Sequence, residues 1–70
     1  MTVCVLVDLE DMCRLLHEEY ERAAREEGWK THPDLHGAFD DCPDANRRTM
    51  RRALHAVLME VGARFTTEEA

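Results

Sequence analysis

The chain has 70 residues, of which 44% are hydrophobic and 34% are charged, and its net charge at pH 7 is −6. This length allows one small domain, so we expect residues 1–70 to fold as a single unit with 66–70 as a frayed tail. The acidic balance argues against binding to nucleic acid or to an anionic membrane surface.

The cysteines and the short N-terminal apolar run indicate the cellular compartment of the protein. Three cysteines are an odd number and lack the density of a secreted disulfide scaffold, which favours a reduced cytosol. The apolar run at residues 3–7 is too short for a signal peptide or a membrane span. We therefore expect a cytoplasmic protein, in the host cytoplasm if the chain is viral.

Residues 2–7, TVCVLV, are rich in β-branched side chains and favour a short extended segment. A single strand is not stable alone, so it must pair within the chain, with the same strand of a second copy, or with another protein. The second of these possibilities is a homodimer through residues 2–7. The alternative to a strand is an early start of the first helix, because Val5 and Leu6 also fit its apolar stripe.

The spacing of apolar residues predicts an amphipathic helix over about 9–27. Asp8 is the expected N-cap, and Gly28 supplies the left-handed residue that ends the helix. We expect Trp29 to fold back on the apolar face and anchor the core. The predicted apolar stripe consists of Leu9, Met12, Cys13, Leu16, Tyr20, Ala23 and Ala24. The opposite face carries Glu18, Glu19, Glu21, Arg22, Arg25 and Glu26.

A loop over residues 30–42 and a second helix over about 43–61 complete the predicted fold. We expect the loop to be ordered, with Leu35 and Phe39 inserted into the core. Pro43 suits the first position of the helix, capped by Asp41 or Cys42. The apolar stripe of the second helix consists of Met50, Ala53, Leu54, Val57, Leu58 and Val61. The predicted fold class is mostly α, a two-helix hairpin.

Charge is distributed unevenly between the two halves. Residues 1–45 contain four Lys/Arg and twelve Asp/Glu, whereas residues 46–70 contain five and three. An internally paired helix hairpin would show this pattern, and so would a head-to-tail dimer.

The combined pattern resembles the small domain repeated in ryanodine receptors, which also occurs in short microbial and phage proteins. The resemblance covers roughly residues 12–62. Its motifs are Leu16-His17-Glu18 with Tyr20, Gly28-Trp29, Pro33 and Leu35, Phe39-Asp40, Pro43-Asp44, and Asn46-Arg47. It implies a helical pair that acts as a binding or regulatory module, and the short format implies a phage accessory protein. The loop after Trp29 is shorter than the family pattern, and Cys42 replaces a usual aliphatic residue.

A metal site is the sharpest chemical alternative in the sequence. Cys13 and His17 have the i, i+4 spacing that can direct two ligands at one ion, His32 and His36 repeat it, and Cys42 is near. However, no CxxC signature is present, and Cys13 lies on the apolar stripe, where a free cysteine acts as a small hydrophobe. We therefore predict no metal and no cofactor.

Two surfaces are candidate binding sites. Arg47, Arg48, Arg51 and Arg52 form a basic ridge on the second helix, and we predict that this ridge or the acidic face of the first helix contacts a protein partner. Alternatively, His17, Tyr20, Trp29 and Asp40 line a pocket for a small ligand or nucleotide. No catalytic motif is present, so we do not expect an enzyme. The leading hypothesis is a non-enzymatic protein–protein interaction module.

Overall fold

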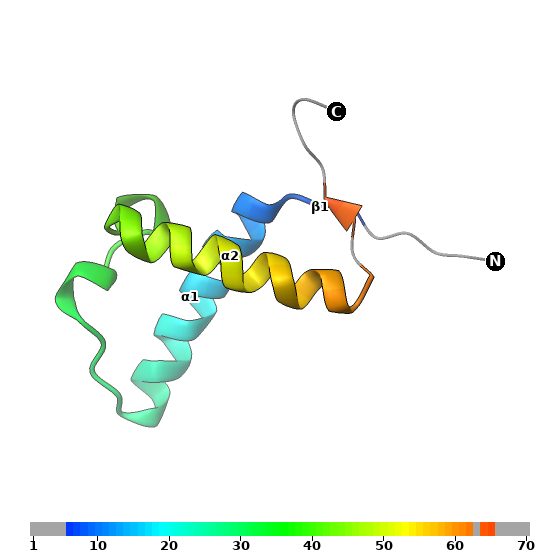
Figure 1. Cartoon of the computed structure of the whole chain (residues 1–70). Coiled ribbons are helices and arrows are strands. Elements are labelled where there is room, and N and C mark those ends of the chain that lie inside the picture. The colour runs from blue at the N-terminus through cyan, green and yellow to red at the C-terminus, as the bar shows by residue number, and fades with distance from the viewer. Residues whose placement is uncertain (1–5, 63, 66–70) are drawn as a thin grey trace.

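Two long helices joined by two short 3-10 helices make up most of the protein. In the computed structural model, which describes residues 6–62 and 64–65, α1 spans Leu9–Glu27 and α2 spans Asp44–Glu60. Between them lie η1 (Pro33–Leu35) and η2 (Phe39–Asp41) (Figure 1). The prediction of a mostly α two-helix hairpin is confirmed, with helix bounds within one residue of those expected. The predicted tail at 66–70 lies outside the described residues.

The ends of α1 follow the predicted capping chemistry. Asp8 has an extended backbone (φ −91°, ψ 114°), and its carboxylate accepts a hydrogen bond from the Asp11 backbone N–H at 3.1 Å. Gly28 has φ 83°, the left-handed conformation that a glycine adopts without strain. The Trp29 N–H then donates to the Ala24 carbonyl oxygen at 2.7 Å, an acceptor that it shares with the Gly28 N–H at the helix end.

The start of α2 differs from the prediction. Pro43 is the N-cap rather than the first helical residue, and neither Asp41 nor Cys42 caps the helix, which has no side-chain cap. Instead, the Arg47 guanidinium reaches back, and its Nε–H donates to the Cys42 carbonyl oxygen at 3.0 Å. The helix is thus joined to the preceding loop by a charged side chain and not by a capping carboxylate.

A minimal parallel sheet joins the beginning and the end of the described chain. β1 (Leu6–Val7) pairs with β2 (Arg64–Phe65), with Leu6 opposite Arg64. For these two residues the extended prediction is confirmed, the strand partner is in the same chain, and the helix does not start early. Residues 2–5 lie outside the described part, and self-association through residues 2–7 stays a prediction.

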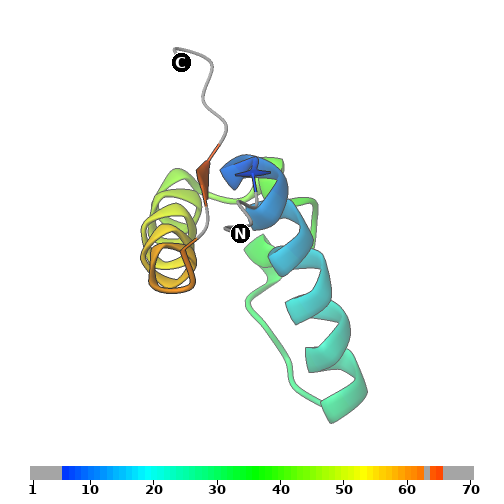
Figure 2. The same ribbon diagram turned by 90° about the vertical axis from the view of Figure 1, so that its right-hand side faces the viewer.

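The two helices cross steeply and do not run side by side along their length. In Figure 1, α2 passes across the first part of α1, while the second part of α1 continues beyond it. In Figure 2, α2 is seen nearly end-on beside a descending α1. The loop after Gly28 returns along α1 and packs η2 against it. Because the helices diverge, α2 cannot cover the apolar face of α1 along its whole length.

The core is small and unusual in composition. Its buried hydrophobic side chains in the described chain are Cys13, Ala24, Phe39 and Cys42, and they are joined by buried His17 and Glu21. Exposed large hydrophobic side chains are Leu15, Leu16, Tyr20, Trp29, Val57, Met59 and Val61. The prediction that Phe39 inserts into the core is confirmed. The prediction that Trp29 anchors the core is wrong, because this side chain is 69% exposed.

The buried face of α1 is rotated about the helix axis relative to the predicted apolar stripe. Its buried positions, Cys13, His17, Glu21 and Ala24, lie along one edge of the predicted apolar face. Leu16 and Tyr20, which we expected in the centre of that face, are exposed. Three of the seven predicted stripe positions, Leu16, Tyr20 and Ala23, are therefore left exposed by the described chain.

Candidate functional site

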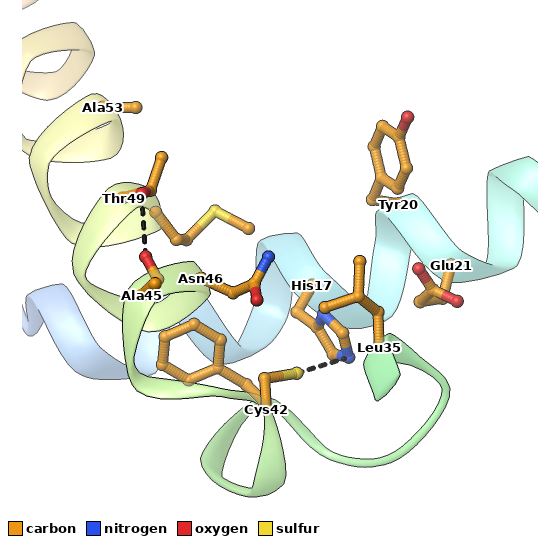
Figure 3. A pocket seen from close by; sticks show the side chains of 11 residues that line it. His17, Tyr20, Glu21, Leu35, Cys42, Ala45, Asn46, Thr49 and Ala53 are labelled. Carbon is orange, nitrogen blue, oxygen red and sulfur yellow. Dashed lines mark hydrogen bonds between the residues drawn. The ribbon is translucent and has the colours of Figure 1, made fainter. Parts of the chain in front are cut away.

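A groove of about 470 Å³ lies where α1, the η1–η2 loop and α2 meet (Figure 3). Most of its lining is apolar. The lining side chains are His17, Tyr20 and Glu21 from α1, Leu35, Phe39 and Cys42 from the loop, and Ala45, Asn46, Thr49, Met50 and Ala53 from α2. Its volume lies within the range of roughly 300–1,000 Å³ that is typical of ligand pockets.

His17 forms the floor of this groove and fastens the loop to α1. Its Nε2 lies 2.8 Å from the Gly37 carbonyl oxygen, and its ring packs at a tilt against Phe39, with ring centroids 6.2 Å apart. Since a carbonyl oxygen only accepts hydrogen bonds, Nε2 carries the proton in this contact. His17, predicted as a ligand-binding residue, is therefore a buried structural donor at the base of the groove.

Cys42 lies beside this imidazole but is not activated by it. The Cys42 Sγ is 3.9 Å from His17 Nε2, and the thiol donates to the Ala38 carbonyl oxygen at 3.5 Å. Burial raises the pKa of the Cys42 thiol, as do the charges of Glu21 and Asp41, against the smaller opposing effect of Arg47. A nucleophilic cysteine needs a lowered pKa and a free base, and this pair provides neither.

Both described thiols are expected to react slowly in the folded protein. Burial, followed by the charge of Glu10, also raises the pKa of Cys13, which is fully buried. In a Cys4→Ser background, alkylation by iodoacetamide at pH 8 should be at least tenfold slower than in urea. The raised pKa values also make the free energy of unfolding depend on pH. The stabilising contribution of the neutral thiols is complete below their ordinary pKa of 9.0 and is lost as pH rises through the raised pKa values. Alkylation at equal rates in folded and unfolded protein would contradict the burial of the two thiols.

Glu21 is a second buried polar residue that joins α1 to the loop. Its Oε1 accepts a hydrogen bond from the Thr31 hydroxyl at 2.7 Å. The sequence pattern placed Glu21 on the exposed face of α1, and this prediction is wrong because the returning loop covers it. The only available signal was its i+4 position after His17, which puts both side chains on the same edge of the helix.

The structure does not bring the four predicted ligand-binding residues together. His17 and Tyr20 both line the groove, with Tyr20 at its rim (Figure 3). Trp29 instead lines a separate hollow at the far end of α1 with Thr31 and other loop residues. Asp40 points to Arg14, whose Nε donates to its carboxylate at 3.0 Å. The predicted ligand pocket is therefore reduced to two of its members.

The basic ridge is also divided by the fold. Arg47 contacts the carboxylate of Asp44 in addition to the Cys42 carbonyl. Arg51 forms a two-point ion pair with Glu10 of α1, with distances of 2.5 and 3.2 Å. In the described part of the chain, exposed Arg48 and Arg52 have neither a side-chain hydrogen bond nor an ion pair. Only these two of the four predicted arginines remain available to a partner.

Candidate metal ligands are held in other contacts. His32 Nδ1 accepts from the Asp34 N–H at 3.0 Å, and His36 Nε2 contacts the Thr31 carbonyl oxygen at 3.0 Å. Among residues 6–62 and 64–65, no group of three or more His, Cys, Asp or Glu side chains is placed to hold a metal ion.

Comparisons with known proteins give no assignment. No family model matches the chain. No curated protein and no solved structure matches it either. The resemblance to the ryanodine-receptor repeat therefore stays a prediction. None of the described helices is long and apolar enough to cross a membrane.

Proposed function

We propose that this chain is a non-enzymatic module that binds another polypeptide through the groove between α1 and α2. The observation that carries the proposal is the reversed burial of hydrophobic side chains. Two cysteines, an alanine and a single aromatic side chain are buried, while large hydrophobic side chains such as Tyr20 and Val57 are exposed. Large apolar side chains that gather on one exposed surface are typical of protein interaction sites.

The groove fits an amphipathic helical segment better than it fits a flat surface. It is bounded by two diverging helices and lined mainly by apolar side chains, the arrangement in which a partner helix inserts one apolar face. Arg48 and Arg52 lie on the outer side of α2, where their charges favour acidic residues at the edge of the bound segment. The partner predicted by this chemistry is an apolar helix face with acidic flanks.

A displayed library of random peptides tests this proposal even though the partner has not been identified. We expect enrichment of amphipathic peptides with acidic flanks. Ala53→Arg, which fills the groove, should weaken their binding at least tenfold in fluorescence titrations. Ala56→Arg is the matched control, because Ala56 is an exposed alanine of α2 outside the groove lining. No enrichment by a monomeric chain, or equal binding by the two variants, would count against the groove as the binding site.

A small ligand is the second candidate, because polar groups also reach the groove. The Asn46 amide points toward His17, and the Tyr20 hydroxyl lies at the rim (Figure 3). The lining contains no Lys or Arg to bind phosphates, so a neutral, largely apolar compound fits better than a nucleotide. A thermal-shift screen separates the candidates, since a ligand at 100 times its Kd adds about 2.7 kcal/mol of stability. A role as a phage accessory protein is the part of the proposal that rests on the family resemblance alone.

A further inference from the structure

Each helix presents an apolar flank that the rest of the described chain leaves open. On α1 this flank consists of Leu16, Tyr20 and Ala23, at i, i+4 and i+7, and all three are exposed. On α2 it consists of Ala53 and Val57, which are exposed at i and i+4. Tyr20 and Ala53 line the same groove, so the two flanks open toward the same space.

The charges beside the two flanks have opposite signs. Glu27 lines a shallow hollow with Tyr20 and Ala23, and Glu26 follows Ala23 by three residues on the same side of α1. Arg48 and Arg52 lie beyond the α2 flank, on its side away from α1. In the described chain none of these four side chains forms an ion pair. Their charges are complementary but unpaired.

These four charges cannot meet within one chain. Glu26 and Glu27 are at the end of α1 that extends away from the helix crossing (Figure 1). By contrast, the pair that does lie at the packed end of α1, Glu10 with Arg51, is formed. Ion pairs within the monomer therefore involve only some of the opposite charges on the two halves.

We infer that the groove is occupied by α1 of a second copy, and that the protein is a two-fold symmetric dimer. In this dimer the α1 flank of each copy packs antiparallel on the α2 flank of the other. Leu16 then lies near Val57 and Tyr20 lies near Ala53. The two-fold axis makes each contact occur twice, so both open flanks are covered at once. The inference rests on the proposed function, because it names the polypeptide that the groove binds.

Charge fixes the direction of the packed helix. In the antiparallel register, Glu26 and Glu27 of one copy approach Arg48 and Arg52 of the other, near the first half of α2. The parallel register would instead bring them toward Glu60, an acidic residue at the end of the same helix. Like charges brought together would oppose that arrangement, so the antiparallel register is the one that the surface favours.

Sedimentation equilibrium of the full chain tests the inference. We expect a mass of twice the 8.1 kDa of one chain, and a monomer for Tyr20→Arg. Leu15→Arg is the matched control and should stay dimeric, because Leu15 is a comparably exposed side chain on another side of α1. Helical content from circular dichroism must be unchanged in both variants. A monomeric wild type, or a dimer that Tyr20→Arg leaves intact, would overturn the inference.

Charge reversal gives a second test that does not depend on apolar packing. Glu26→Arg with Glu27→Arg should weaken dimerisation at least tenfold at low salt, and Arg48→Glu with Arg52→Glu should do the same. Combining all four changes should restore the dimer, since the charges are again complementary. Absence of this rescue would overturn the antiparallel register. A monomeric chain that still binds library peptides through the groove would overturn the inference alone, and the proposed function would stand.

Discussion

Replacing Phe39 with alanine is expected to remove about half of the free energy of unfolding at 25 °C. Phe39 is 3% exposed and is the largest of the buried hydrophobic side chains in the described part of the chain. Removing such a ring costs about 3–5 kcal/mol, whereas a chain of this size has a total stability of roughly 4–10 kcal/mol. The loss should be large because the ring packs against His17 and closes the loop over α1. Urea unfolding followed by circular dichroism measures it.

Trp29→Ala is the control for this prediction. Trp29 is the larger side chain, but it is 69% exposed and lies beyond the end of α1. Its removal should change the free energy of unfolding by about 0.5 kcal/mol or less, as exposed substitutions usually do. If Trp29→Ala destabilised the protein as much as Phe39→Ala, the core would have to include the end of α1.

The second large effect is expected at His17. His17→Leu keeps a side chain of similar bulk but removes the donor to the Gly37 carbonyl oxygen, 2.8 Å away in a part-buried contact. An acceptor left without its partner costs about 1–3 kcal/mol, and more if the loop loses its position. The measurement is urea unfolding at pH 7. Faster hydrogen exchange of the Leu35 and His36 amides should accompany it.

The chain contains a matched control for this histidine. His36 Nε2 also contacts a backbone carbonyl oxygen, that of Thr31 at 3.0 Å, but His36 is exposed. Water can replace its hydrogen bond, so His36→Leu should cost about 0.5 kcal/mol or less. Equal costs at the two positions would show that burial around His17 does not decide the effect.

Helix bounds could be predicted because their signals are local. Asp8 and Gly28 define the ends of α1 through contacts within one turn, and the structure confirms both. The turn of α1 about its axis could not be predicted. An i, i+3, i+4 series shows how wide an apolar face is, but which edge becomes buried depends on distant partners. Gly37 and Thr31 decide it by hydrogen bonding to His17 and Glu21.

The sequence indicated which residues could belong to the candidate site but not how the fold arranges them. The arginine ridge was visible from spacing alone, yet the fold assigns Arg51 to Glu10 on the other helix. The proximity of Cys42 to His17 required the loop to return along α1, and no local pattern reports such a return. The burial of Trp29 was predicted wrongly because large aromatic side chains are highly buried on average. The turn at Gly28 instead places this side chain beyond the packed region.

The strand pair has a consequence for the order of folding. Leu6 pairs with Arg64, so this contact closes a loop that contains both helices and everything between them. Loop closure is costly in entropy, and a ladder of two residues per strand gives little in return. Helix formation and the crossing of α1 with α2 shorten the effective loop, so the strand pair should form after them. It should also open first, as a local fluctuation that leaves the helices and the groove intact.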